Sequence, residues 1–227
     1  MSFSGTAVAR PPALIRDQVA AQIREAITEL RLMPGQVLVE RELCETTTAS
    51  RATVREALRQ LESEGLVSST NGRGTVVATL SVEDARQIYE VRSALEGMAG
   101  RLFAERASDQ ERRTLRAALL HLEEVADDTR QLSIAKTEFY GVLVGGAQNI
   151  ELKQILDSIN RRVTLVRVVS LLEPGRAKQS IAEVQAICDA AVSGDGARAE
   201  ELCRRHVENA AAAALPRLAE GADLQQL

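Results

Sequence analysis

The stretch that decides the fold is SRATVREALRQLESEGLV, residues 50–67. Ser50 is typical of a helix N-cap, because its hydroxyl can accept a hydrogen bond from a free backbone N–H of the first turn. Gly65 is the residue type that most often ends a helix in the left-handed conformation. The apolar side chains recur at helical spacing and indicate one buried stripe: Val54, Ala57, Leu58 and Leu61. The stretch therefore predicts a short amphipathic helix that leads directly into a strand.

The polar side of this helix carries arginine. Arg51, Arg55 and Arg59 are four residues apart, so their side chains project along one side. Guanidinium groups on the first turns of a short helix can pair with guanine edges or phosphates in the major groove of DNA. An ordinary amphipathic surface helix is the alternative that this segment alone leaves open.

Two further helical segments precede the arginine helix. Residues 14–30 carry apolar side chains at helical spacing and end before Pro34-Gly35. Residues 40–45 form a second, shorter segment, and residues 46–49 form the turn into the arginine helix. This order predicts a helix-turn-helix.

A hairpin follows. Residues 66–69 and 75–78 are two β-prone runs, and Asn71-Gly72 between them is a strong hairpin signal. Helices followed by a hairpin form the plan of a winged helix-turn-helix domain. Arg73, framed by two glycines, would lie at the tip of the wing.

Residues 14–78 resemble the DNA-binding domain of the GntR family of bacterial transcription regulators. The resemblance is carried by Pro34-Gly35, LVEREL at 38–43, SRATVREAL at 50–58, LESEGLV at 61–67 and Gly72-Arg73-Gly74. It implies DNA contacts at these positions: Arg41, Ser50, Arg51, Thr53, Arg55, Gly72 and Arg73.

Composition bounds the remainder. The chain has 227 residues, of which 45% are hydrophobic and 2% aromatic, so its cores must be aliphatic. We expect two domains, residues 1–79 and 80–227. No apolar run is long enough for a membrane span, and residues 1–12 lack the apolar core of a signal peptide, so we expect a cytoplasmic protein. The three cysteines are scattered and do not suggest a disulfide framework.

Net charge is −4, which gives no diffuse attraction to DNA. Residues 1–79 contain nine Lys or Arg and nine Asp or Glu, while the remainder contains 19 and 23. DNA binding would therefore depend on locally placed arginines. With few phosphate contacts per subunit, dimerisation would be needed for useful affinity.

After residue 80 the pattern changes to helix after helix. Ser108 to Glu111 has the sequence of a capping box. The expected helical segments run over about 81–106, 108–127, 132–145, 150–173, 177–193 and 197–219. The fold class is therefore predicted as mainly α: a winged helix-turn-helix domain followed by an all-helical bundle of six to seven helices.

This second half resembles the helical effector-binding (FCD-type) domain of FadR-like GntR regulators. The resemblance is carried by VRSALE at 91–96, Phe139, Asn149, Gly194-Asp195 and RHV at 205–207. In many relatives an Asp and three His hold a divalent metal that helps to bind a carboxylate effector. Here Lys136, Tyr140 and Val184 occupy three of those positions, and His206 alone remains. One imidazole is too few ligands for zinc or nickel, so no metal and no cofactor are predicted.

The replacements suggest a cationic pocket. Lys136 and Tyr140 lie four residues apart on one helix face, and the ammonium could supply the positive charge that an anionic effector needs. Tyr140 and His206 could add hydrogen bonds, and Arg92 could clamp a carboxylate. Two alternatives stay open. In the first, the site has decayed or takes an apolar ligand. In the second, an unusual metal site recruits Cys188 and Cys203.

The sequence as a whole predicts a homodimeric bacterial transcription regulator, a repressor that reads an inverted repeat. A small carboxylate metabolite, bound without metal, would modulate operator binding. A metal-dependent or ligand-independent regulator of the same fold is the alternative. An enzyme is not predicted, because no catalytic triad spacing and no phosphate-binding glycine loop is present.

Overall fold

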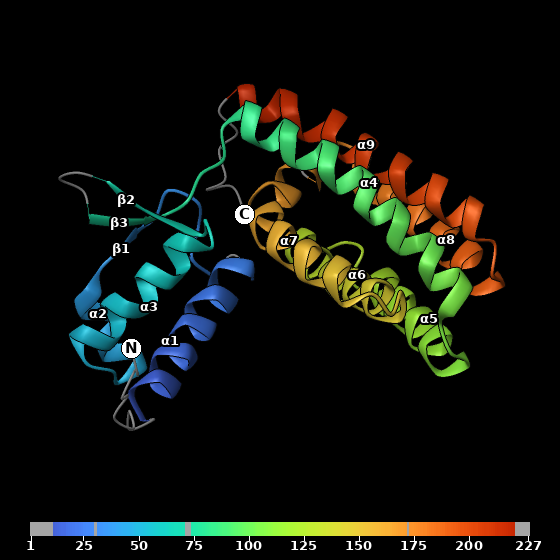
Figure 1. Ribbon diagram of the computed structural model, residues 1–227. Coiled ribbons are helices and arrows are strands. Elements are labelled where there is room, and N and C mark those ends of the chain that lie inside the picture. The colour runs from blue at the N-terminus through green and yellow to red at the C-terminus, as the bar shows by residue number, and fades with distance from the viewer. Residues whose placement is uncertain (1–10, 30, 71–73, 172, 221–227) are drawn as a thin grey trace, which may run out of the picture. The chain divides into compact units, whose positions relative to one another are not determined.

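The computed structural model describes most of the chain: residues 11–29, 31–70, 74–171 and 173–220. The chain divides into two compact units, residues 1–27 with 31–78 and residues 28–30 with 79–227, and each is drawn in Figure 1. We call the first the winged unit and the second the helical unit. None of the helices in the described ranges has the length and apolarity needed to span a bilayer.

The winged unit combines helices with a small antiparallel sheet. Its elements are α1 (Pro11–Thr28), β1 (Val37–Leu38), α2 (Glu40–Thr47), α3 (Arg51–Ser63), β2 (Val67–Thr70) and β3 (Gly74–Val77). The strand order is β1-β3-β2, with Val37 opposite Val76 and Val67 opposite Val77. The β2–β3 pair is the predicted hairpin. Strand β1 was not predicted, because two residues are too short to show alternation.

Helix α3 has the predicted caps and the predicted buried face. The Thr53 backbone N–H donates to Ser50 Oγ at 3.2 Å, and Gly65 adopts a left-handed φ of 73°. Its buried residues are Val54, Ala57, Leu58 and Leu61. A second left-handed residue, Thr48 with φ 54°, ends α2. That conformation is uncommon for a β-branched side chain and reverses the chain between α2 and α3.

The helical unit contains six helices in the described residues. They are α4 (Val82–Arg106), α5 (Asp109–Glu124), α6 (Thr129–Gly146), α7 (Ile150–Leu171), α8 (Arg176–Ser193) and α9 (Gly196–Ala219). The predicted capping box forms between Ser108 and Glu111. Helix α6 begins one turn earlier than expected, because the Gln131 N–H donates to Asp128 Oδ1 and makes Asp128 the N-cap.

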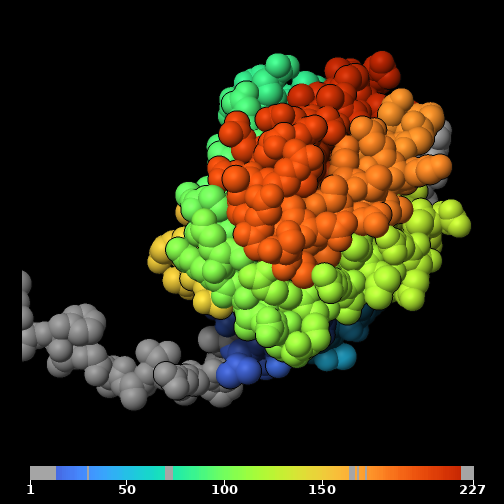
Figure 2. Space-filling model, turned by 90° about the vertical axis from the view of Figure 1, so that its right-hand side faces the viewer, coloured from blue at the N-terminus to red at the C-terminus, as the bar shows by residue number. Residues whose placement is uncertain are grey.

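Helices α4 and α9 pack closely side by side (Figure 2). Glycine makes this approach possible at two positions of α4. A Cβ on Gly100 would lie 2.7 Å from Cys203 Sγ and 3.1 Å from the Ala199 carbonyl oxygen. A Cβ on Gly97 would lie 2.7 Å from Arg204 Cγ.

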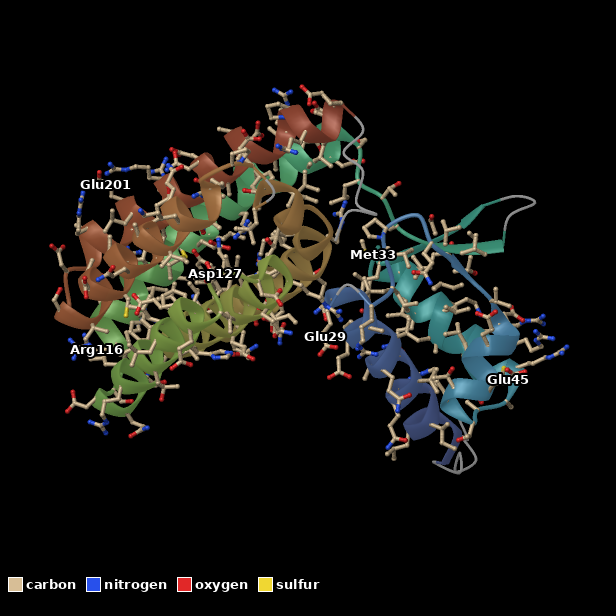
Figure 3. All side chains as sticks on the ribbon, turned by 180° about the vertical axis from the view of Figure 1, so that it is seen from behind. Glu29, Met33, Glu45, Arg116, Asp127 and Glu201 are labelled. Carbon is tan, nitrogen blue, oxygen red and sulfur yellow. The ribbon has the colours of Figure 1, made fainter. Side chains whose placement is uncertain are left out.

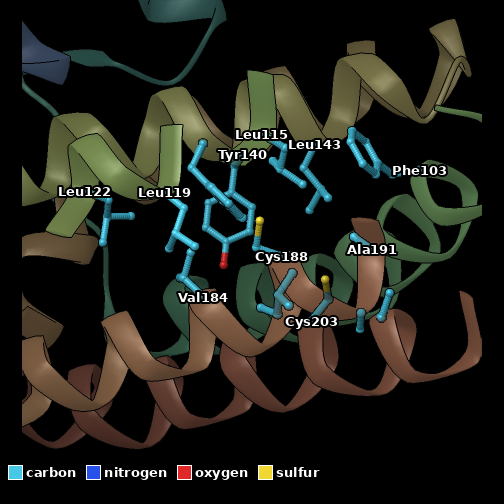
Figure 4. Close-up of a cluster of buried hydrophobic side chains, with 14 of the residues drawn as sticks. Phe103, Leu115, Leu119, Leu122, Tyr140, Leu143, Val184, Cys188, Ala191 and Cys203 are labelled. Carbon is cyan, nitrogen blue, oxygen red and sulfur yellow. The ribbon is translucent and has the colours of Figure 1, made fainter. Parts of the chain in front are cut away.

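An aliphatic core fills the helical unit, as the composition predicted. Figure 4 shows Tyr140 among Leu119, Val184 and Cys188, and each of these side chains is buried. Phe139 packs edge-on against Tyr140. This apolar packing surrounds a smaller set of buried charged side chains.

Candidate DNA-binding surface and buried polar cluster

Three of the four arginines predicted to contact DNA, Arg41, Arg51 and Arg55, lie on the surface of the winged unit. Arg51 is exposed on the first turn of α3, and 61% of the Arg55 side chain is exposed one turn later. Arg41 on α2 is 74% exposed. Gly72 and Arg73, the predicted wing tip, lie outside the described residues. Figure 3 shows the outward projection of charged side chains at Glu45 on α2 and Glu201 on α9.

Ser50 and Arg55 are already held by neighbours. Ser50 Oγ caps α3 and lies 2.8 Å from Thr53 Oγ1, so its described contacts are structural. Arg55 Nε donates to both carboxylate oxygens of Glu40 at 2.9 Å. This hydrogen bond lowers the pKa of Glu40 and raises the pKa of Arg55. Glu40 therefore orients the Arg55 guanidinium in the absence of DNA.

The four predicted effector residues come together inside the helical unit. They belong to a buried group, which we call the polar cluster: Arg92, Glu96, Lys136, Tyr140, Arg167, Arg176, Ser180, Glu183 and His206. Lys136 is 4% exposed and His206 is 1% exposed. Five helices, α4 and α6 to α9, contribute side chains.

A chain of hydrogen bonds runs through Lys136 and His206. Lys136 Nζ donates to Ser180 Oγ at 2.5 Å and lies 3.2 Å from His206 Nε2. On the other side of the ring, His206 Nδ1 lies 2.5 Å from Glu183 Oε2. Because the Glu183 carboxylate only accepts, the network assigns a neutral ring protonated at Nδ1, which leaves Nε2 to accept from Lys136 Nζ. Both ring nitrogens of His206 are therefore engaged.

Burial and charge shift the pKa values of this chain. Burial, together with the nearby Lys136, lowers the pKa of His206 to about 3. The pKa of Lys136 falls well below its usual value, through burial first and then through repulsion by Arg167 and Arg176. Partial burial raises the pKa of Glu183, but hydrogen bonds from His206 and Asn209 help to outweigh this effect and lower the pKa to about 2.

Arg92 forms a closed ion pair beside two tyrosines. Its Nε donates to Glu96 Oε1 at 2.6 Å, and both side chains are almost completely buried. The guanidinium carbon lies 5.8 Å from the Tyr89 ring centre and 6.0 Å from that of Tyr140. The Tyr140 ring also stacks on His206, with centroids 6.0 Å apart. Arg92 thus has an anionic partner within the protein.

The family's metal-binding positions do not gather metal donors in this chain. In the part of the chain that the structure describes, no three His, Cys, Asp or Glu side chains are grouped so that they could hold a metal ion. Val184 packs in the apolar core, as do Cys188 and Cys203. Burial raises the pKa of both thiols, which opposes thiolate ligation.

Sequence reasoning missed several members of the polar cluster. Arg167, Arg176, Ser180 and Glu183 were not singled out, although Glu183 directly precedes the inspected Val184. The usable signal was a charged residue interrupting an apolar helix face, as Arg167 does between Val163 and Leu171, four residues to either side.

Two family models match the chain. "Bacterial regulatory proteins, gntR family" matches residues 15–77, and "FCD domain" matches residues 87–209. These matches cover the winged unit and most of the helical unit. They confirm the family resemblance read from both halves of the sequence.

Named relatives and a solved structure agree. The "Probable D-xylose utilization operon transcriptional repressor" of Paenarthrobacter nicotinovorans is 32% identical, over 86% of this chain and 88% of its own length. The Nta operon transcriptional regulator of Aminobacter aminovorans is 36% identical, over 59% of this chain and 64% of its own. A crystal structure described as "a putative transcriptional regulator GntR from Rhodococcus sp. RHA1" has the same fold, with a TM-score of 0.76 and 24% identity, covering 88% of this chain and 97% of that one.

Proposed function

Because the chain belongs to the gntR family of bacterial regulatory proteins and carries an FCD domain, we propose that it is a transcription repressor controlled by a small anionic metabolite. The winged unit binds operator DNA, and the helical unit binds the metabolite without a metal. The observation that carries the DNA-binding assignment is the exposure of Arg51 and Arg55 on successive turns of α3. The residues proposed to contact DNA are Arg41, Ser50, Arg51, Thr53, Arg55, Gly72 and Arg73.

The first turns of α3 suit the major groove. Arg51 forms no hydrogen bond with another described residue, so its guanidinium donors are available to a guanine edge or a phosphate. Arg55 is positioned by Glu40, whose carboxylate also opposes close approach of phosphate. We assign Arg51 the larger contribution to affinity and Arg55 a role in selecting sequence.

Operator binding requires two copies. The near-zero charge balance of the winged unit provides little attraction to DNA, so a dimer on an inverted repeat supplies the remaining contacts. Helix α4 exposes Val91 and Met98, which lie two turns apart and are 50% and 39% exposed. This exposed apolar pair supports α4 as part of the surface where a second copy packs.

The effector site is the polar cluster. Arg92, Lys136, Tyr140 and His206 are buried together, as an anion site in the bundle core requires. Metal independence is supported by His206, because its two ring nitrogens already face Lys136 and Glu183. Ligand binding there would favour one arrangement of the winged units over another and so change operator affinity.

The DNA-binding assignment is tested with genomic DNA fragments that have been selected by their binding to the purified wild-type protein. Arg51→Ala is expected to abolish binding in a gel-shift assay, with a dimer of unchanged size in light scattering. Arg198→Ala on α9 removes a surface arginine of the helical unit and is the matched control. Wild-type affinity of Arg51→Ala would remove α3 from the DNA interface.

The effector assignment has its own test. Lys136→Ala is expected to leave DNA binding intact and to eliminate release by the metabolite extract that releases the wild type. Elemental analysis of the wild-type protein is expected to find no stoichiometric metal. A bound metal at one equivalent per chain, or an unchanged response of Lys136→Ala, would overturn this assignment.

A further inference from the structure

Buried polar atoms without a partner gather in one place within the helical unit. In the described residues they include Tyr89 Oη, Glu96 Oε2, Ser133 Oγ, Tyr140 Oη, Arg167 Nε and Nη2, and Arg176 Nε and Nη1. A buried donor left unpaired costs about 1–3 kcal/mol, and more when it is charged. Four guanidinium nitrogens without an acceptor in one interior therefore indicate a site built for something that accepts hydrogen bonds.

Arg167 presents one complete edge of its guanidinium. Its Nη1 donates to Thr137 Oγ1 at 2.5 Å and approaches the Ser133 carbonyl oxygen at 3.4 Å. Nε and Nη2 share the opposite edge and meet no acceptor in the described residues. Two parallel N–H donors on one edge match the two oxygens of a carboxylate or phosphate. The side chain is 4% exposed, so this edge points into the protein.

Arg176 is similarly half-used. At the start of α8, its Nη2 donates to Glu183 Oε2 at 2.9 Å, and the side chain is 4% exposed. Its Nε and Nη1 lack partners within the described ranges. Glu183 is shared with His206, so it does not satisfy the Arg176 guanidinium fully.

The cluster contains more cationic groups than carboxylates. Four side chains can carry positive charge: Arg92, Lys136, Arg167 and Arg176. Glu96 pairs with Arg92 and Glu183 pairs with Arg176, whereas Arg167 and Lys136 have no ion-pair partner in the described part of the chain. Burial and the Arg92 charge lower the pKa of Arg167 to about 10, the response expected of a cation without a counter-charge.

We propose that the polar cluster binds a doubly charged small anion, a dicarboxylate or a phosphate monoester, with the free edge of Arg167 as its principal clamp. Arg176 and Lys136 complete the site. This inference rests on the proposed function and narrows the effector class. A bound anion raises the lowered pKa of Lys136 and so favours its protonated form. Two negative charges then match Arg167 and the Lys136 ammonium, whereas a monoanion would leave one of the two buried and uncompensated. Arg92, already paired with Glu96, contributes position more than charge.

The charge requirement is tested on the full-length protein by thermal unfolding at constant ionic strength. The probes are C4 to C6 dicarboxylates and C3 to C6 phosphate monoesters, each matched with the monocarboxylate or alcohol of the same carbon skeleton. At least one dianion is expected to raise the Tm, and its matched analogue is not. A rise with dicarboxylates alone or with phosphate monoesters alone identifies the source. No rise with any dianion, or equal rises with the monoanions, would overturn the proposal.

The clamp is tested with charge-preserving variants. Arg167→Lys and Arg176→Lys keep the charge and lose the guanidinium edge, so the dianion is expected to bind at least about tenfold more weakly, which corresponds to about 1.4 kcal/mol. Arg198→Lys on the surface of α9 is the control. Wild-type dianion affinity in Arg167→Lys would remove it from the site.

The DNA assay separates this inference from the proposed function. Retained DNA binding and circular dichroism in the two variants show that the fold is intact. If the wild-type protein binds no DNA, the repressor assignment is overturned, while the anion site is not. A wild type that binds DNA but no dianion would overturn the anion site alone.

Discussion

The winged unit and the helical unit place the same residue type in opposite surroundings. Arg55 on α3 is 61% exposed beside Glu40, whereas Arg167 on α7 is 4% exposed with one edge unpaired. An exposed ion pair contributes little to stability, so its arginine can exchange partners at small cost. A buried guanidinium without a counter-charge is destabilising. The difference supports our proposal that the exposed arginines bind a large charged partner and the buried ones a small one.

The largest expected effect comes from breaking the buried ion pair. Arg92→Ala leaves the Glu96 carboxylate buried without its partner, and we expect a loss of about 3–5 kcal/mol in unfolding free energy. Urea unfolding measures it. Arg55→Ala, which breaks an exposed pair, is the matched control and should unfold like the wild type. If Arg92→Leu with Glu96→Leu is no more stable than Arg92→Ala, the unpaired charge is not the cause.

Acid should destabilise the helical unit through its buried ionisable side chains. Folded His206 has a pKa of about 3, below its value in the unfolded chain, so the unfolded state binds a proton that the folded state does not. As the pH is lowered from about 6.5 to about 3, the unfolding free energy therefore falls by about 1.4 kcal/mol per pH unit. Glu183, with its pKa of about 2, adds to this loss below about pH 4.5.

Urea unfolding at pH 7, 6, 5 and 4 measures this slope. His206→Gln should flatten it, whereas His121→Gln, at a half-exposed position, should keep it. In the winged unit, the hydrogen bond between Glu40 and Arg55 shifts the pKa values of both groups, and both lie at the surface. Equal slopes in the two variants would contradict the assignment to His206.

Close packing in the helical unit can be tested at a single methyl group. Gly100→Ala places a Cβ against Cys203 Sγ and the Ala199 backbone, and overpacking of this kind costs about 1–3 kcal/mol. Gly141 on α6 has no neighbour within 4 Å of an added Cβ, so Gly141→Ala should instead gain about 0.5–1 kcal/mol. Thermal unfolding of both variants measures these changes. A higher Tm for Gly100→Ala would contradict close packing of α4 against α9 at this position.

The smallest expected effect lies in the winged unit. Thr48 adopts φ 54° between α2 and α3, a conformation that costs about 1–2 kcal/mol for a residue with a Cβ. Thr48→Gly relieves this strain but increases the entropy of the unfolded chain, so we expect a net gain below about 1 kcal/mol. Differential scanning calorimetry measures the change. A lower Tm would show that the Thr48 side chain contributes contacts that outweigh the strain.

Local signals in the sequence predicted most of the elements. Ser50 and Ser108 mark helix starts by capping chemistry, and the Asn71-Gly72 pair marks the hairpin, because these signals act over a few residues. Strand β1 escaped prediction because its two residues pair with β3 from a distance along the chain. The start of α6 differed because Asp128, and not a residue near 132, caps it.

The polar cluster was predicted only in part. Lys136, Tyr140 and His206 were found because they stand where the family resemblance directed attention. Arg167 and Arg176 were missed because the sequence contains many arginines and no local signal separates a buried one from an exposed one. Burial of a long charged side chain is decided by which helices pack around it, and that is a property of the folded bundle.

Helix α4 connects the buried Arg92 of the helical unit to the segment of chain that leads from the winged unit. It begins at Val82, shortly after the winged unit ends, and ten residues later it carries Arg92. Ten residues of α-helix span about 15 Å, and a helix held along its length transmits displacement instead of absorbing it. At Gly97 and Gly100, helix α9 packs closely against the same helix. If a ligand at Arg92 tilts this helix, as the proposed function requires, we expect the displacement to reach Ser81, from which the chain leads back to the winged unit.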